Sequence, residues 1–318
     1  MNSSQKIRSK VSIGIPVFNG ELFLKKRLDS ICSQTFTDFE IIISDNASTD
    51  STSTICQEYE KKDERTHYIK QKKNMGVWWN YKFVVEQAKG EYFVWAAADD
   101  WWKPDFLEKN VKELESNKNL IGSISEVKIL DMLNKQISLQ NEPEKSENFV
   151  KYQYSIPAYG TYEQRVAIYL KLRQGTSMYA VYRTKEVIKT MSDVYETAGD
   201  LALILNLLKF GDFHVLDEVL MYRHSKGMSS TKTHIEFLRK QNYNLFIIIF
   251  PYAPFTKWCL KNLGLRIFMK NIGFFIKLNY RGERRIILEL MRKNSTLNKI
   301  IDKLIEFKSK RRNRKLEK

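Results

Sequence analysis

The sequence predicts an α/β fold: a mostly parallel, Rossmann-like sheet flanked by helices, followed by a basic helical C-terminal extension. Two observations predict it. Short apolar, β-branched runs alternate with amphipathic stretches of helical period, as in successive βαβ units. The excess of basic residues is confined to the C-terminal part, where basic and apolar residues interleave. We therefore predict a globular α/β domain over 1–230 and a basic amphipathic region over 231–318.

The composition is that of a globular protein. Of the 318 residues, 43% are apolar and 28% are charged, which allows one large α/β domain and something smaller. Cys32, Cys56 and Cys259 are odd in number and widely spaced, which indicates reduced thiols in a cytosolic protein. The N-terminus is polar, and the strand after it is too short for a signal-peptide core, so we expect no secretion signal.

The first half of the chain alternates between strand and helix patterns. The run at 11–18 predicts a strand, and Asn19-Gly20 ends it with a turn signal. The elements predicted next are a helix with Leu22, Phe23, Leu28 and Ile31 on one face, a strand at 39–45, a helix capped within 48–51, a strand at 66–71, a turn at 74–76, a helix ending before Lys89-Gly90, and a strand at 91–98.

The signals are sparser in the second half of this domain. Lys103-Pro104-Asp105-Phe106 predicts a helix start, because proline is favoured in a first turn. Asp200 precedes an apolar helical pattern, and 214–222 predicts a strand. Residues 131–160 are polar and aromatic without clean periodicity, so we expect an irregular loop there.

Polar residues fall where the predicted parallel strands end. Asn19 follows the first strand, Asp45 ends the second, and Asp99-Asp100 ends the fourth. Such edges are where α/β sheets bind ligands. The glycine-rich phosphate loops of dinucleotide-binding and Walker-type proteins are absent from the sequence. A bound diphosphate would therefore need a divalent cation held by carboxylates, and Asp99-Asp100 is suited to Mg²⁺ or Mn²⁺.

Four spaced motifs resemble those of the inverting family 2 glycosyltransferases, which have the GT-A fold and include enzymes of bacterial surface-polysaccharide assembly. The motifs are Pro16-x-x-Asn19, the stretch Ser44 to Asp50, Asn74-x-Gly76 with Asn80, and Ala98 to Pro104. They occur in the family's order, and the resemblance covers about residues 10–230. It implies that 1–230 is a GT-A catalytic domain.

The resemblance also implies the residues that bind the donor and the metal. Asp45 resembles the carboxylate that binds the base or ribose of a nucleoside-diphosphate sugar, although turn preference alone would make it a strand-end residue. Asp99 matches the metal-binding carboxylate, whereas Ala97 stands where the family commonly has another Asp. Asp100 is either a second metal-site residue or the cap of the next helix. The predicted donor-binding residues are Pro16, Asn19, Asp45, Asn74, Asp99 and Arg223, and the predicted metal-binding residues are Asp99, Asp100 and His224.

A transferase of this kind needs a base for the acceptor hydroxyl. In the family, an Asp at the start of a helix like the one after residue 200, followed by a Tyr-Arg-x-His segment, is the catalytic base. Asp200 is therefore the predicted base, although the same position favours an N-cap. One carboxylate can serve as cap and as base, since capping fixes its direction.

The C-terminal part predicts the environment of the acceptor. Residues 231–318 hold 22 Lys and Arg against 6 Asp and Glu, which accounts for the whole net charge of +16. The longest uncharged run, 241–256, contains two prolines and is too short to span a bilayer. Interleaved basic and large apolar residues favour an anionic membrane surface. The same charge would also fit nucleic acid, or an ordinary helical subdomain with a solvated basic face.

We therefore predict a metal-dependent glycosyltransferase of the hexosyltransferase type. It would move a sugar from a UDP-linked donor to a saccharide acceptor, lipid-linked on the evidence of the tail, at the inner face of the cell membrane. Two alternatives remain: a nucleic-acid-binding protein that uses the basic tail, although nucleic acid is the less favoured partner, and a catalytically silent protein of this fold, which Ala97 makes plausible.

Overall fold

The computed structural model describes residues 9–130, 149–153, 155–172, 175–191, 198–224, 235 and 245–291. The chain divides into two compact units, Met1–Ser230 and Thr231–Lys318. Each unit is considered by itself.

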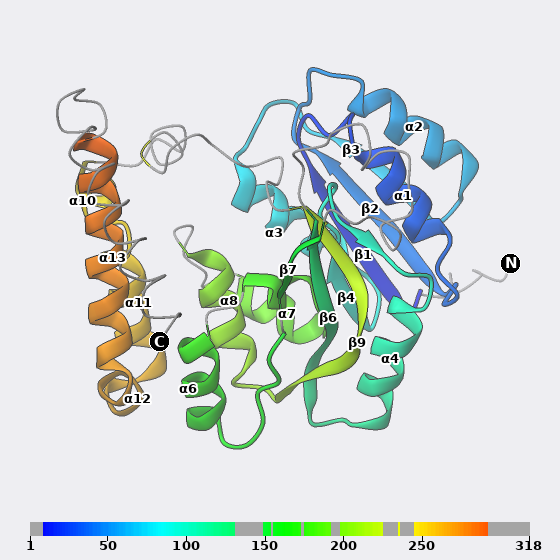
Figure 1. The fold of residues 1–318 in the computed structure, drawn as a ribbon. Coiled ribbons are helices and arrows are strands. Elements are labelled where there is room, and N and C mark those ends of the chain that lie inside the picture. Colours follow the sequence, from blue (N-terminus) through cyan, green and yellow to red (C-terminus); the bar gives the residue numbers. More distant parts are fainter. Residues whose placement is uncertain are drawn as a thin grey trace, which may run out of the picture. The chain divides into compact units, whose positions relative to one another are not determined.

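One sheet runs through the first unit, with helices packed on it (Figure 1). Its strands are β1 (Val11–Val17), β2 (Phe39–Asp45), β3 (Thr66–Lys70), β4 (Tyr92–Trp95), β5 (Trp101–Trp102), β6 (Leu120–Leu130), β7 (Phe149–Gln153), β8 (Val181–Arg183) and β9 (Asp212–His224). Its helices are α1 (Leu24–Cys32), α2 (Thr52–Lys62), α3 (Val77–Gln87), α4 (Phe106–Ser116), α6 (Tyr162–Leu172), the 3₁₀-helix η2 (Gly175–Tyr179), α7 (Thr184–Met191) and α8 (Gly199–Leu207).

The strand order is β3-β2-β1-β4-β8-β6-β9-β5, with β7 beside β6. Strand β1 pairs in parallel with β2 and β4, β2 with β3, and β6 with β9. The remaining pairings are antiparallel. The predicted α/β fold is confirmed, and the βαβ units of the N-terminal half form the continuous parallel part of the sheet.

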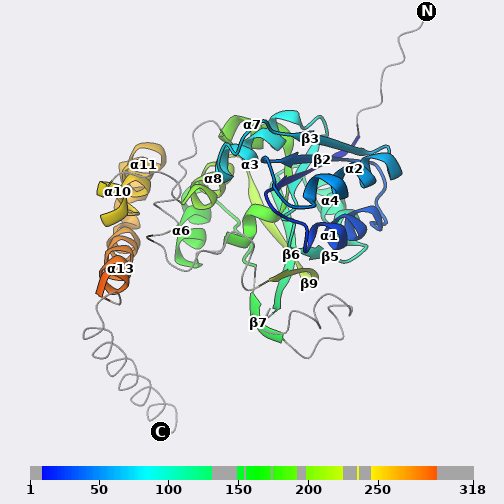
Figure 2. The same ribbon diagram turned by 90° about the horizontal axis from the view of Figure 1, so that it is seen from above.

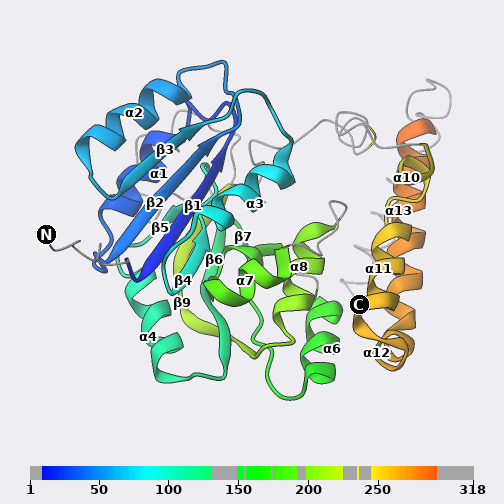
Figure 3. The same cartoon turned by 180° about the vertical axis from the view of Figure 1, so that it is seen from behind.

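The strand order switches between β1 and β4, and open α/β sheets form their ligand-binding crevice at such a point. The chain moves from β1 outward to β3 and then returns to the other side of β1. Because such crossovers are right-handed, α1 and α2 cover one face and α3 the other, where α7 also lies (Figures 2 and 3). The carboxyl ends of β1 and β4 therefore flank the point where strand order switches, which is where open α/β sheets bind ligands.

Three elements differ from the sequence prediction. Strand β4 ends at Trp95 instead of residue 98, and the N–H of Asp100 bonds the C=O of Ala97 at 3.2 Å in the turn that follows. The next two residues then form β5, which pairs antiparallel with β9. The expected irregular loop at 131–160 is a partly wrong prediction, because 149–153 is strand β7, paired with β6. Residues 131–148 lie outside the described part of the chain.

Helix α3 packs closely on β1 because the strand carries a glycine at the contact. A Cβ atom at Gly14 would lie 2.6 Å from the ring of Phe93 and 2.8 Å from the side chain of Val84 on α3. Any larger residue would therefore push the helix away from the sheet. Because α3 lies this close to β1, its residue Asn80 can reach the ends of the neighbouring strands.

Asn80 ties α3 to the ends of β1 and β2. Its Oδ1 accepts a hydrogen bond from the Ser44 hydroxyl at 2.5 Å, and its Nδ2 donates to the C=O of Ser44 at 2.9 Å and of Val17 at 3.4 Å. The side chain is 3% exposed. These hydrogen bonds hold the carboxyl ends of β1 and β2 in place against α3, because a buried polar group that loses its partner destabilises the fold.

The second unit contains helices α10 (Leu245–Ile249), α11 (Ala253–Leu263), α12 (Leu265–Lys270) and α13 (Ile272–Met291). Phe268 and Phe275 stack with ring centroids 4.5 Å apart, and Phe255 is fully buried. Among the residues that the structure describes, no helix has both the length and the apolar content needed to cross a membrane.

We expect Asn80→Ala to lower the free energy of unfolding by about 2–3 kcal/mol, because it leaves a buried carbonyl and a buried hydroxyl of Ser44 without their partner. Chemical denaturation measures the change. Gln87→Ala at the exposed end of the same helix is the control and should change stability by less than about 0.5 kcal/mol. Equal effects of the two substitutions would contradict the assignment.

Candidate active site

Asn19 joins the loops that follow β1 and β2. Its N–H donates to the Ser48 hydroxyl at 2.9 Å, and its Oδ1 accepts from the N–H of Thr49 at 2.9 Å. Its backbone is left-handed, with φ 51°, which is uncommon for a residue other than glycine. Pro16 lies within β1 opposite Ser44 and is half-buried. The donor contacts of both residues stay predictions.

Asp45 is fully buried at the end of β2, with both oxygens engaged. Oδ1 accepts from the N–H of Ser48 at 2.8 Å, and Oδ2 accepts from the hydroxyl of Tyr68 at 2.9 Å. The turn-residue role is therefore present in the structure. A carboxylate has about four acceptor positions, so the predicted ribose or base contact is compatible with these bonds. Tyr68 was not predicted from the sequence, and its hydroxyl reaches Asp45 from the neighbouring strand.

Asn74 belongs to a turn organised by Asn46. The Asn46 amide donates to Asn74 Oδ1 at 3.0 Å and to the C=O of Gly76 at 3.1 Å, and it accepts from the N–H of Met75 at 2.8 Å. Gly76 has φ 93°, which glycine adopts without strain. This turn therefore lies beside the β2 end of the crevice, with Asn74 exposed. Its donor contact stays a prediction.

The acidic pair follows β4 at the switch point. Asp99 is partly exposed, whereas Asp100 is 4% exposed and accepts from Arg223 Nε at 3.0 Å. Burial raises the pKa of Asp100 to about 6, with Arg223 lowering it, Asp99 raising it further and Arg27 opposing. Asp100 is not the cap of α4, because Asp105 holds that position. Its partner is instead the strand β9 arginine.

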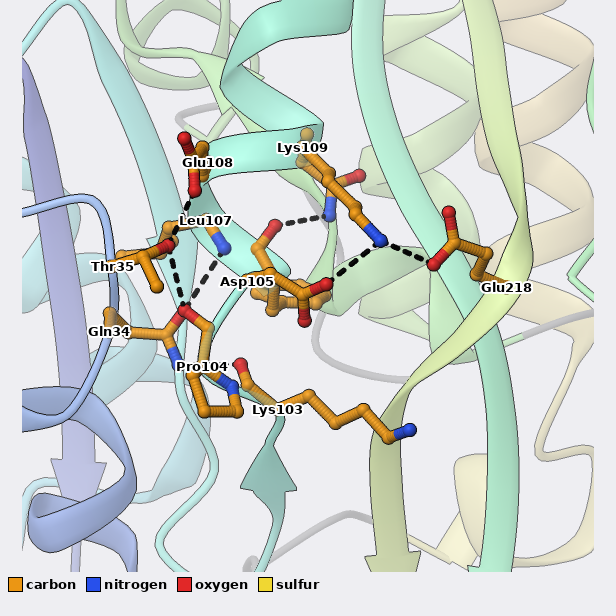
Figure 4. Close-up of polar contacts among 11 residues, drawn as sticks. Gln34, Thr35, Lys103, Pro104, Asp105, Leu107, Glu108, Lys109 and Glu218 are labelled. Atoms are coloured by element: carbon orange, nitrogen blue, oxygen red, sulfur yellow. Dashed lines mark hydrogen bonds and ion pairs between the residues drawn. The ribbon is translucent and has the colours of Figure 1, made fainter.

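Hydrogen bonds between the segment that follows α1 and the start of α4, here called the α1–α4 clamp, hold the chain in place just after the acidic pair (Figure 4). Gln34 Nε2 donates to the C=O of Lys103 at 2.7 Å, and its Oε1 accepts from the N–H of Leu107 at 3.0 Å. Thr35 N–H donates to the C=O of Pro104 at 2.8 Å. Lys109 pairs with Asp105 and, across the sheet edge, with Glu218 on β9. The turn that carries Asp99 and Asp100 is therefore held at its exit.

Asp200 lies in the first turn of α8 but not at its N-cap, which is Ala198. Its Oδ1 accepts from the N–H of Leu201 at 2.9 Å. Burial raises the pKa of Asp200, and the field of Arg223 opposes the rise. Ala198 has a left-handed backbone with φ 60°. Non-glycine residues in this conformation concentrate at functional sites.

An aromatic and guanidinium wall connects Asp100 with the start of α8. The Arg223 guanidinium lies over the ring of Tyr179, 4.5 Å from its centroid, and the Tyr179 hydroxyl is 3.2 Å from that of Tyr81. The ring of Trp78 is parallel to that of Tyr81. A Cβ atom at Gly199 would lie 3.1 Å from the Trp78 ring. The sequence did not predict this wall, because its parts come from α3, η2 and β9.

The part of the chain that the structure describes contains no group of three or more His, Cys, Asp and Glu side chains that could hold a metal by themselves. His224 ends β9 opposite Leu130, and its side chain lies outside the described part. Asp99 and Asp100 fit an ion that takes one or two protein carboxylates and completes its shell with phosphate oxygens and water.

The fold and this arrangement define an α/β protein of the GT-A type, with a carboxylate pair at the switch point and a third carboxylate, Asp200, at the start of α8. Comparison with known proteins agrees. Residues 12–188 match the family described as glycosyl transferase family 2. The chain belongs to this family.

Individual relatives are more distant. The putative teichuronic acid biosynthesis glycosyltransferase TuaG of Bacillus subtilis is 36% identical over 102 residues, which are 32% of this chain and 40% of that protein. The first three curated relatives are matched over 15%, 40% and 47% of their own lengths. The chain therefore spans less than half of each.

Two solved structures share the fold. Residues 1–349 of TarS from S. aureus, in complex with UDP-GlcNAc, have a TM-score of 0.52 at 19% identity, covering 85% of this chain and 81% of that one. The mannosyltransferase PcManGT from Pyrobaculum calidifontis, in complex with GDP-Man and Mn²⁺, has a TM-score of 0.53 at 13% identity, covering 95% and 81%. At these identities the likeness establishes the fold alone.

Proposed function

We propose that the chain is an inverting, metal-dependent glycosyltransferase that moves a hexose from a UDP-linked donor to a hydroxyl of a lipid-linked saccharide during surface-polysaccharide assembly. One observation carries the proposal. Arg223 pairs with Asp100 of the acidic turn and acts electrostatically on Asp200 at the start of α8, so the predicted donor and base sites meet at one residue. The UDP and UDP-GlcNAc bound by TarS support the choice of donor.

The donor would lie along the carboxyl edge of β1, β2 and β4. Asn19 and Asp45 would contact the nucleoside end, and Pro16 and Asn74 would contact the donor beside them. Arg223 has one nitrogen on Asp100 and is partly exposed, at 26%, so its remaining nitrogens are available for a diphosphate. Arginine binds phosphate oxygens well because its planar fork matches their geometry.

Asp99 and Asp100 would hold Mn²⁺ or Mg²⁺, with His224 as a further candidate ligand. When bound, such an ion neutralises the diphosphate and stabilises the charge that develops on the leaving group. The Mn²⁺ in the PcManGT complex supports a divalent ion in this fold. The chain's own contribution is a partly exposed carboxylate, Asp99, beside the buried and paired Asp100.

Asp200 would act as the general base. In one displacement, the acceptor oxygen forms a bond to the anomeric carbon while the bond from that carbon to the diphosphate oxygen breaks, and Asp200 takes the hydroxyl proton. A single displacement inverts the anomeric configuration. Burial that raises the pKa of Asp200 makes its carboxylate a stronger base than an exposed Asp.

The second unit supports a place at a membrane surface. Large apolar side chains on α13 are exposed, including Ile276 at 63%, Tyr280 at 63% and Ile287 at 56%. Exposed basic residues, Lys277 and Arg284 among them, alternate with these. Apolar and basic side chains together match an anionic lipid interface, so we propose peripheral attachment at the cytoplasmic face, where a lipid-linked acceptor would be found.

We expect Asp200→Asn to lower kcat for transfer by about a thousandfold while UDP binding stays unchanged, because the amide cannot accept the proton. Steady-state kinetics and calorimetry measure the two. In the wild type, kcat should rise with pH and level off above a pKa higher than that of an ordinary Asp, since the base must be ionised. The exposed Asp217→Asn is the control. A wild type that hydrolyses no UDP-sugar would support the catalytically silent alternative.

We expect Asp99→Asn to weaken UDP binding in the presence of Mn²⁺ by about tenfold or more, because one charge that attracts the cation is lost. Calorimetry with and without a chelator measures this, and Asp217→Asn is again the matched control. Donor hydrolysis that neither the chelator nor Asp99→Asn reduces would remove the metal from the proposal.

For the membrane, we expect the full chain to sediment with vesicles of phosphatidylglycerol and phosphatidylcholine. Lys277→Ala, Arg281→Ala and Arg284→Ala together should weaken binding by about a hundredfold, at roughly 1 kcal/mol for each basic residue. These three side chains are exposed on α13.

The control for this experiment removes the same charge from the first unit, through Lys61→Ala, Lys112→Ala and Lys118→Ala, which are also exposed. It should leave vesicle binding nearly unchanged. If both triple variants bind as the wild type does, the membrane assignment fails.

A further inference from the structure

The guanidinium group of Arg27 is buried and makes no hydrogen bond. The side chain is 1% exposed, and none of its three guanidinium nitrogens has a hydrogen-bond partner in the structure. Its Cζ lies 3.7 Å from the ring centroid of Trp102, which is itself fully buried. Burying a guanidinium without acceptors is expensive, so its charge needs compensation from elsewhere.

The compensation comes through space from the acidic pair. Burial lowers the pKa of Arg27 to about 9, and the fields of Asp100 and then Asp99 oppose that change. Arg27 therefore stays protonated at neutral pH. It acts on the two carboxylates through space, because none of its guanidinium nitrogens donates a hydrogen bond to either of them.

Two positive charges oppose the acidic pair. Arg223 pairs directly with Asp100, and Arg27 acts on Asp100 through space. A divalent cation that approaches Asp99 therefore meets less negative charge than the two carboxylates alone would present. Its attraction to Asp99 is correspondingly weak.

A nucleoside diphosphate changes this balance. Its negative charge is attracted by the same guanidinium groups, and its phosphate oxygens supply ligands that the protein lacks. Cation and diphosphate then favour each other's binding, and such coupling is reciprocal.

We propose that Arg27 is a buried counter-charge that keeps the affinity of the acidic pair for a divalent cation low until a nucleoside diphosphate arrives. This inference rests on the proposed function, because it takes Asp99 and Asp100 as the cation site. Arg27 is a positioning residue that acts through its charge and touches no substrate, since its side chain is buried against Trp102. A substitution of Arg223 would not test the effect of a counter-charge alone, because Arg223 is partly exposed and its loss would also break the ion pair with Asp100.

The test measures Mn²⁺ binding by the full chain at pH 8, using electron paramagnetic resonance of the free ion, with and without UDP. We expect Arg27→Met to bind Mn²⁺ about tenfold more tightly than the wild type in the absence of UDP, because a nearby positive charge is gone. UDP should then strengthen Mn²⁺ binding by a smaller factor than in the wild type. Lys25→Met removes an exposed positive charge from the same helix and should leave the Mn²⁺ affinity as it is in the wild type.

The outcomes separate this inference from the proposed function. If UDP promotes Mn²⁺ binding in the wild type but Arg27→Met leaves the UDP-free affinity unchanged, the inference is overturned and the metal site stands. If the wild type binds no Mn²⁺ even with UDP, the metal site of the proposed function fails and the inference fails with it.

Circular dichroism checks that the variants fold. Should Arg27→Met not fold, Arg27→Gln replaces it, since glutamine removes the charge and keeps a polar planar group against Trp102. The same two outcomes then apply to Arg27→Gln.

Discussion

The ion pair between Asp100 and Arg223 is the interaction on which the site depends. It joins the turn after β4 to the end of β9, two segments 123 residues apart in the sequence. Asp100 is buried and Arg223 is partly exposed, and placing a carboxylate in such a pair costs desolvation energy that only good geometry offsets. The surrounding structure supplies this geometry: β5 pairs with β9, and the α1–α4 clamp holds the turn at its exit. Removing either partner would leave a charge stranded at the switch point.

The same pair organises the other side of the crevice. Arg223 stacks on Tyr179, whose hydroxyl meets Tyr81, and α3 carries both Tyr81 and the Trp78 ring that covers Gly199. The position of Asp200 therefore depends on the packing of α3, which in turn depends on Gly14 and on the buried amide of Asn80. A substitution in the core of the sheet that moves α3 would therefore displace both the acidic turn and the start of α8.

The sequence alone predicted those parts of the site whose position depends on residues close by in the chain. Strand ends placed Asn19, Asp45 and the acidic pair at one edge, and apolar periodicity placed Asp200 at a helix start. Strand β5 escaped prediction because two residues form a strand only through a partner far along the chain. Tyr68 and Arg27 escaped for the same reason, since a tyrosine in a strand or an arginine in an amphipathic helix has an ordinary solvated explanation. Their roles arise from packing against Asp45 and Trp102.

The burial of the acidic turn also bears on Ala97, where the family commonly has an acidic residue. Ala97 is 7% exposed and lies in the turn that carries Asp99 and Asp100. A carboxylate there would add a negative charge close to the acidic pair, and both desolvation and like-charge repulsion would oppose its ionisation. An alanine at 97 avoids this cost, and it leaves Asp99 as the partly exposed carboxylate of the turn.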